Sequence, residues 1–119
     1  MIGCDIAQIS RFGSLVSNDS FLKKYFTKSE VEYILSKPNK EQTLAGLYAC
    51  KEAILKAFKI GIGRNIKLAC LEILHDKNGA PMLNWTPELN YFLSNLNCTK
   101  IDISISHDGD YAFAVCQIL

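Results

Sequence analysis

The clearest hydrophobic pattern in the chain is a strict alternation near the C-terminus. Ile101, Ile103 and Ile105 alternate with polar residues, which is the period of a strand with one buried face. The sequence HDGD then favours a turn, and YAFAVCQIL after it is rich in strand-forming residues. Together the two segments predict a C-terminal pair of strands.

The N-terminal segment MIGCDIAQI shows the same period. Ile2, Cys4 and Ile6 share one side, and Asp5 projects from the other, which predicts a short strand that ends near Ile9. An unpaired buried carboxylate costs several kcal/mol or takes up a proton, so an acid among these apolar residues is a candidate ligand. A cap on the following turn is the alternative for Asp5.

Two short helices are expected next. Ser10 can cap the first, with Phe12, Leu15 and Val16 facing inward. In TKSE, the Thr27 side chain accepts from the amide three residues on and Glu30 reaches back, which is a capping box. The apolar face of this second helix would consist of Val31, Ile34 and Leu35.

The middle of the chain favours a longer helix from about 42 to 58, ended by Gly61 or Gly63 in the left-handed conformation. Its apolar positions are Leu44, Leu47, Tyr48, Leu55 and Phe58.

Beyond it, Asn78 and Gly79 suit a tight hairpin turn between two strands. Thr86 caps and Pro87 opens a last helix. The apolar stripe of that helix would be Leu89, Phe92, Leu93 and Leu96.

This order of elements, without repeating βα units, predicts an α+β fold with a mainly antiparallel sheet packed with helices. At 119 residues and 49% hydrophobic, without an internal linker or repeat, the chain fits a single domain over 1–119. A net charge of +1 argues against a general nucleic-acid binder. No apolar run is long enough for a membrane span and no signal peptide is evident, so a cytoplasmic protein is expected.

Cysteine spacing bears on the same question. The five cysteines are odd in number, show no CxxC pair and mostly sit in apolar stretches, so buried reduced thiols are expected in preference to zinc ligands or disulfides. They are Cys4, Cys50, Cys70, Cys98 and Cys116.

Positive charge gathers between residues 51 and 67 around one acid, Glu52. The cations are Lys51, Lys56, Lys59, Arg64 and Lys67. Glu52 and Lys56 lie one helical turn apart, and an ordinary surface ion pair is one interpretation. The other is a magnesium ion shared with phosphate oxygens, because magnesium prefers one or two carboxylates plus phosphate and water. Asp5 is then the candidate second ligand, and His107, at the end of a strand, is a further candidate site residue.

Several motifs in this order resemble those of the holo-acyl-carrier-protein synthases, the small type of phosphopantetheinyl transferase. The N-terminal half matches in GCDIAQISR, FTKSE and AGLYACKEAILKA, and the C-terminal half in DKNGAP and SISHDGDYAFAV. The likeness therefore runs from the first strand to the last and implies the phosphopantetheinyl transferase fold.

The resemblance implies transfer of the 4'-phosphopantetheine arm of coenzyme A to a serine of apo acyl carrier protein, releasing 3',5'-ADP, for fatty acid biosynthesis. Asp5 and Glu52 match the Mg2+ ligands, Lys56 the lysine at the pyrophosphate, and His107 a histidine near the coenzyme. Lys59, Gly61 and Arg64 are the other expected coenzyme contacts. The base that takes the serine proton is left open between a magnesium-bound water and one of the two carboxylates acting through it.

Arg11 matches the residue with which the family grips its acidic carrier protein. Lys23, Lys24 and Lys28 extend this basic stretch, although an ordinary solvated helix face explains Lys23 and Lys24 equally well. The resemblance also implies a homotrimer with active sites at subunit interfaces.

Three departures from the family pattern concern residues around the site. Leu47 replaces a common arginine, Lys59 and Ile60 replace a Gly-Thr pair, and Gln8 replaces a frequent glutamate. A catalytically silent binding module for carrier protein or coenzyme A, and a magnesium-dependent nucleotide pyrophosphatase, are the alternative functions.

Overall fold

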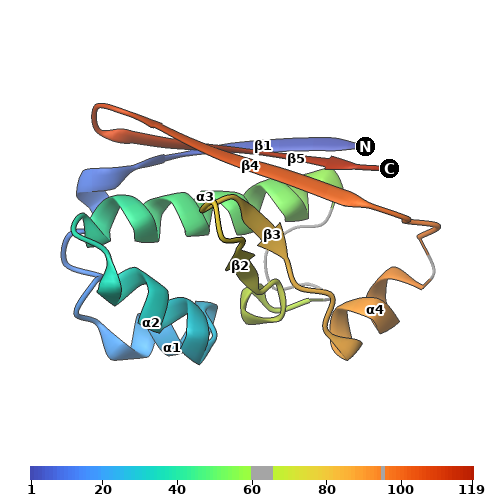
Figure 1. The fold of residues 1–119 in the computed structure, drawn as a ribbon, viewed down its shortest axis with the longest axis horizontal. Coiled ribbons are helices and arrows are strands. Elements are labelled where there is room, and N and C mark those ends of the chain that lie inside the picture. The colour runs from blue at the N-terminus through green and yellow to red at the C-terminus, as the bar shows by residue number, and fades with distance from the viewer. Residues whose placement is uncertain (60–65, 95) are drawn as a thin grey trace.

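A computed structural model describes residues 1–59, 66–94 and 96–119. A three-stranded sheet lies along one side of the long helix α3, Lys40–Ala57. Figure 1 shows the short helices and a β-hairpin on the other side of α3. The central helix is thus covered on two sides, and its residues form much of the core.

The sheet is antiparallel throughout, as predicted. It consists of β1 (Ile2–Gln8), β5 (Tyr111–Ile118) and β4 (Ile101–Asp108), in the order β1-β5-β4. Ala114 of the central strand β5 is opposite Asp5 of β1 on one side and Ile105 of β4 on the other. The last two strands of the chain therefore lie beside the first, and both termini lie at the same end of the sheet (Figure 1).

The two faces of this sheet differ. Toward α3 the central strand presents small buried residues, Ala112, Ala114 and Cys116. On the opposite face Ile2, Ile6, Tyr111 and Phe113 remain 43–69% exposed. The apolar row of β1 that the alternation identified is therefore the exposed row, and Asp5 is on the side of the helix.

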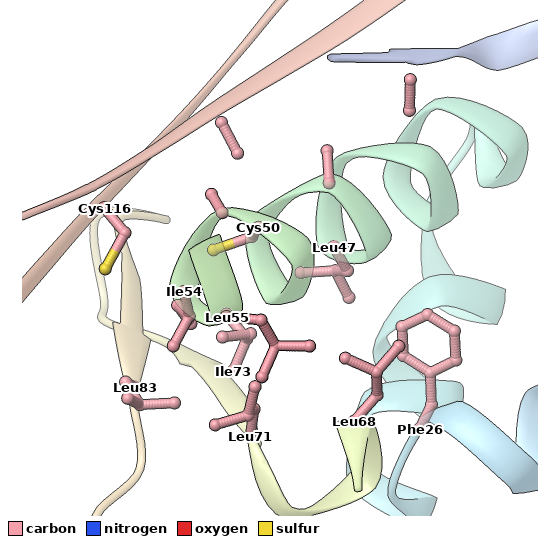
Figure 2. Packing of buried hydrophobic residues seen from close by; sticks show 14 of the residues in the cluster. Phe26, Leu47, Cys50, Ile54, Leu55, Leu68, Leu71, Ile73, Leu83 and Cys116 are labelled. Carbon is pink, nitrogen blue, oxygen red and sulfur yellow. The ribbon is translucent and has the colours of Figure 1, made fainter. Parts of the chain in front are cut away.

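Helix α3 begins after Asn39, whose side chain accepts a hydrogen bond from the Gln42 amide at 3.1 Å. Leu44, Ile54 and Leu55 are buried along it. Figure 2 shows Leu55 packed beside Ile73 and other apolar side chains beneath the helix. The helix thus begins two residues before the predicted start at 42. Gly61 and Gly63, which were expected to end it, lie outside the described residues.

The segment between β1 and α3 differs most from expectation. Ser10 caps no helix: residues Ile9–Phe12 form a short 3-10 turn, η1, without a side-chain cap. An unpredicted helix, α1, spans Asp19–Tyr25 and is capped by Asn18. The amide and hydroxyl of Ser10 donate instead to the Asp110 carboxylate, which is distant in sequence, so Ser10 is not free to cap a helix.

Helix α2, Lys28–Ser36, begins with the predicted capping box of Thr27 and Glu30. Ile34 is buried as expected, but Leu35 is 45% exposed. The prediction for Leu35 was wrong because α2 contacts the rest of the chain through a narrower face.

The predicted hairpin is present, with strands β2, Ile73–His75, and β3, Pro81–Leu83. Its loop is longer than a two-residue turn, because the Asp76 carboxylate accepts from the amides of Asn78 and Ala80. In this loop Gly79 has a positive φ of 84°.

Helix α4, Pro87–Leu93, is capped by Thr86 as predicted, whereas Leu96 lies beyond the helix and is 39% exposed. The 3-10 turn η2, Leu68–Cys70, precedes β2. None of the helices in the described parts of the chain could cross a membrane.

All five cysteines are free, as predicted. Cys50 and Cys116 are buried between α3 and the sheet (Figure 2). Cys4 is exposed, so the expectation of burial was wrong for this thiol, because it belongs to the outer row of β1.

Candidate functional site

Strand β1 approaches α3 unusually closely at Gly3. A Cβ atom at this position would overlap the backbone of Ala53 and Ala57. Only a residue without a side chain permits this distance, and it brings Asp5, two residues later on the same face, against the C-terminal half of the helix. The glycine therefore helps to place the carboxylate.

Asp5 forms an ion pair with Lys56 of α3. The ammonium of Lys56 donates to Oδ1 of Asp5 at 2.8 Å. The Lys56 side chain is 55% exposed and the Asp5 side chain 19%. The hydrogen bond to Asp5 raises the pKa of Lys56. The predicted pairing of Lys56 with Glu52 is therefore replaced by a contact between helix and strand.

Glu52 lies one turn before Lys56. Its Oε1 atom is buried and has no hydrogen-bond partner among the described residues. Burial raises the pKa of Glu52, the nearby negative charge of Asp5 raises it further, and Tyr48 and Lys56 oppose the rise. The structure therefore brings Asp5, Glu52 and Lys56 together, as the sequence predicted.

Tyr48 forms the wall of the site one turn before Glu52. Its ring packs against Phe12, Phe21 and Tyr25 at centroid distances of 5.4–6.2 Å. Burial, followed by the charge of Glu52, raises the pKa of the Tyr48 hydroxyl to about 12. The hydroxyl thus stays protonated beside the carboxylate.

The two carboxylates fit a magnesium ion. Both groups are hard oxygen ligands, and the buried Oε1 of Glu52 has no hydrogen-bond partner in the part of the chain that the structure describes. Within residues 1–59, 66–94 and 96–119 no group of three or more acids, cysteines or histidines could hold a metal, so the protein would supply two ligands only. Such a site suits an ion that shares its remaining positions with phosphate and water.

Lys51, which belongs to the cation cluster in sequence, is not part of this site. Its side chain is fully buried and its ammonium donates to Glu30 Oε1 at 2.7 Å. It also donates to the carbonyl oxygens of Tyr25 and Leu68, each at 2.9 Å. Lys51 therefore offers no charge to a ligand, because its donors are directed into the core.

Glu30 completes this buried pair. Its Oε1 also accepts from the Thr27 amide at 2.9 Å, and its Oε2 accepts from the Ile73 amide at 3.0 Å. The capping-box glutamate thus joins the start of α2 to α3 and β2.

His107 lies apart from the carboxylates. It is on β4, two strands away from β1, and packs against Gly46, where a Cβ atom would lie 2.9 Å from its Nε2. It lines a cleft with Tyr33, Thr43 and His75. Gly46 precedes Glu52 by six residues, or about 9 Å along the helix, so one subunit does not bring His107 to the acids.

The other expected coenzyme contacts are only partly described. Lys59 is exposed just after α3 and has a positive φ of 60°. Gly61 and Arg64 lie outside the described residues. Leu47, at the position of the family's arginine, is buried in the core (Figure 2).

The basic residues expected to bind the carrier protein are all exposed. Arg11 lies in η1, Lys23 and Lys24 in the last turn of α1, and Lys28 at the start of α2. Lys23 and Lys28 also flank a groove that contains Phe26.

A contact that the sequence did not predict holds η1 in place. The amide and hydroxyl of Ser10 donate to the Asp110 carboxylate at 2.9 and 2.8 Å. The turn between β4 and β5 therefore fixes the residue next to Arg11. Lone polar residues 100 positions apart gave no signal for this pairing.

The sequence model of the 4'-phosphopantetheinyl transferase superfamily matches residues 1–116 of the chain. Among similar proteins, the holo-acyl-carrier-protein synthase of Caldicellulosiruptor saccharolyticus is 42% identical over 117 residues, covering 98% of this chain and 93% of the relative. The corresponding synthase of Finegoldia magna is 39% identical with the same coverage.

Solved structures give the same result. The holo-acyl-carrier-protein synthase of Helicobacter pylori in complex with coenzyme A superposes with a TM-score of 0.87, at 30% identity, over 100% of both chains. The synthase of Neisseria meningitidis gives a TM-score of 0.89 at 26% identity, over 99% of this chain and 96% of the other. The fold of these enzymes is thus the fold of this chain.

Proposed function

The chain belongs to the 4'-phosphopantetheinyl transferase superfamily, and we propose that it transfers the phosphopantetheine arm of coenzyme A to a serine of apo acyl carrier protein. The products are holo carrier protein, for fatty acid biosynthesis, and 3',5'-ADP. This proposal rests on the convergence of Asp5, Glu52 and Lys56, from β1 and α3, around a buried carboxylate oxygen that has no hydrogen-bond partner among the residues the structure describes.

Asp5 and Glu52 would hold Mg2+. When bound, this ion acts as a Lewis acid on the phosphoryl oxygens of coenzyme A. The two carboxylates would hold the ion at the pyrophosphate, and the partial burial of Asp5 and of Glu52 Oε1 limits competition from water.

Lys56 supplies the positive charge next to the scissile bond. Because its side chain is 55% exposed, the ammonium can reach a phosphate of a bound coenzyme. There it stabilises the negative charge that develops on the departing 3',5'-ADP. Lys56 would thus stabilise or protonate the leaving group.

Arg11 and the exposed lysines of α1 and α2 would receive the acidic carrier protein. Arg11 is held by the Ser10–Asp110 contact, close to the start of the aromatic cluster around Tyr48. We expect Arg11→Ala to raise KM for the carrier about tenfold, the effect of losing one ion pair at an interface, and to leave KM for coenzyme A nearly unchanged. Steady-state kinetics with each substrate varied in turn measures both; equal increases contradict this division of roles.

The exposed sheet face supports self-association into a homotrimer. Ile6 and Phe113 are directly opposite each other on β1 and β5 and are 63% and 43% exposed. A contiguous apolar surface of this kind is typical of an interface. Ile6 and Phe113 also line a hollow with His107 and Asp108. In such a trimer the active sites would lie at subunit interfaces, where His107 and the carboxylates would come from different copies.

Light scattering tests this assembly. Phe113→Asp is expected to reduce the molecular mass of the particle from about three chains to one, and to reduce turnover with it. A monomeric wild type would contradict the proposed trimer.

The transfer itself is tested by mass spectrometry of an apo acyl carrier protein incubated with the enzyme, Mg2+ and coenzyme A. The carrier gains the phosphopantetheine mass with the wild type. Asp5→Asn and Glu52→Gln lose at least about a thousandfold in rate, or about 4 kcal/mol, because each removes a magnesium ligand.

Two other outcomes would identify the alternative functions. Calorimetric binding of coenzyme A or carrier protein without any mass gain indicates a silent binding module. Release of 3',5'-ADP from coenzyme A in the absence of carrier protein indicates a pyrophosphatase.

We place the reaction in the cytoplasm, where free thiols such as the five of this chain persist. Residues 1–119 would act as one catalytic unit within each subunit.

A further inference from the structure

The ion pair between Lys56 and Asp5 occupies an oxygen that the magnesium ion would also use. Lys56 donates to Oδ1 of Asp5 at 2.8 Å, and magnesium binds carboxylate oxygens at about 2.0–2.1 Å. A divalent ion on the same oxygen, Oδ1, would therefore lie within about 5 Å of the ammonium, where like charges repel each other. Lys56 and the metal thus oppose each other at Asp5.

We propose that Lys56 competes with the divalent ion for Asp5, and that coenzyme A relieves this competition by drawing the ammonium onto its phosphates. The inference rests on the proposed function, since it takes coenzyme A as the phosphate ligand. Its consequence is that coenzyme and metal bind cooperatively, although they are different ligands of adjacent groups.

The properties of the three side chains support this exchange. Lys56 is 55% exposed at the end of a flexible four-carbon chain, so it can leave Asp5 without a change in the backbone. Glu52 Oε1, in contrast, is buried and has no hydrogen-bond partner in the described parts of the chain, so Glu52 has no ion pair to break before it binds a metal. Lys56 is therefore the group that moves, and the carboxylates are the groups that stay.

Charge balance favours the same sequence of events. With Lys56 on Asp5, the two carboxylates carry a net charge of about −1, which attracts a divalent ion weakly. With Lys56 on a phosphate, the same pair carries about −2. Because coupling between two ligands is reciprocal, the metal also strengthens the binding of coenzyme A, and coupling of this kind typically amounts to about 5–150-fold.

A titration with Mn2+, followed by electron paramagnetic resonance of the free ion, tests the competition without any turnover. In the absence of coenzyme A, Lys56→Met should bind Mn2+ about tenfold more tightly than the wild type. The control Lys100→Met removes an equal charge from another ion pair, that of Lys100 and Asp102 at 3.3 Å, and should leave the affinity unchanged.

A second titration, with coenzyme A present, tests whether the coenzyme relieves the competition between Lys56 and the divalent ion. Coenzyme A should tighten Mn2+ binding by a larger factor in the wild type and in Lys100→Met than in Lys56→Met. Equal or weaker Mn2+ binding by Lys56→Met without coenzyme overturns the inference, and Lys56→Gln serves if the methionine variant does not fold. The carrier assay on the wild type tests the proposed function separately, because the first titration requires neither coenzyme nor transfer.

Discussion

Helix α3 supplies the lysine of two ion pairs, each with an acid from another element, and the two pairs differ in their exposure to solvent. Lys51 and Glu30 are fully buried, whereas Lys56 and Asp5 are 55% and 19% exposed. Lys51 makes its hydrogen bonds to protein groups only, including the carbonyl oxygens of Tyr25 and Leu68. We call the first pair closed, because its polar atoms are all hydrogen-bonded within the protein. The second pair is open: it is partly exposed and lies beside Glu52 Oε1, which has no hydrogen-bond partner among the described residues.

The difference teaches which charges are available to a ligand. A closed pair has every donor and acceptor engaged, so a ligand could only disrupt it. An open pair with an unsatisfied acid gains hydrogen bonds and charge neutralisation when a ligand arrives. Position within a motif does not show whether a charge is available to a ligand. Lys51 and Glu52 are adjacent residues of one motif, yet Lys51 is engaged in the core and Glu52 belongs to the open site.

The largest effect is expected for the closed pair. Lys51→Met should lower the free energy of unfolding by about 3–5 kcal/mol, because it leaves the Glu30 carboxylate buried without its partner. Urea denaturation measures the change. Glu30→Gln is expected to cost a similar amount, because it removes the counter-charge of the buried Lys51 ammonium and turns an amide NH2 toward a donor. A loss below about 1 kcal/mol in both variants would contradict a pair whose donors and acceptors are all engaged.

The next effect concerns Glu52 and has the opposite sign. Burial and Asp5 raise its pKa from 4.5, so the folded state holds this proton more tightly than the unfolded chain and pays a penalty at pH 7. Glu52→Gln should therefore raise the free energy of unfolding, by no more than about 1 kcal/mol because the carboxylate is partly solvated.

The pH dependence of this gain is the check. Without divalent ions it should be largest at neutral pH, shrink as the pH falls through the raised pKa of the folded state, and vanish only well below 4.5, where both states carry the proton. A gain that persists in acid would show that the lost charge is not its cause. Added Mg2+ should stabilise the wild type and not the variant.

The smallest effects are expected at the exposed pairs. Lys56→Met should change stability by less than about 1 kcal/mol, and Lys100→Met by less than about 0.5 kcal/mol, because solvent screens both. Thermal unfolding in low and high salt measures the difference. If Lys56→Met proved as damaging as Lys51→Met, the distinction between the open and closed pair would be wrong.

Short-range patterns predicted much of this fold. The period of two in β4 and the capping boxes and caps at Thr27 and Thr86 depend on neighbours within a few residues, and each is confirmed. The prediction failed where Ser10 had an alternative partner, because Asp110 is distant in sequence. It also failed to find α1, whose cap at Asn18 was overlooked beside the more prominent serine.

The candidate site was predicted from the motif resemblance, and its geometry was not. That Asp5 and Lys56 would pair, and that Lys51 would be withdrawn into the core, depends on the rotation of α3 relative to the sheet. That rotation is set partly by Gly3, whose missing side chain permits close packing. No periodicity in one sequence expresses such a contact between elements.

Cys4 gives the exposed sheet face an intrinsic chemical reporter. Its thiol is accessible on β1, between Ile2 and Ile6, whereas Cys50 and Cys116 are buried. Alkylation by a small maleimide, mapped by peptide mass, should therefore be fast in dilute protein and slow once copies associate through this face. The alkylation rate of the native Cys4 would thus report association through this face, without an engineered cysteine.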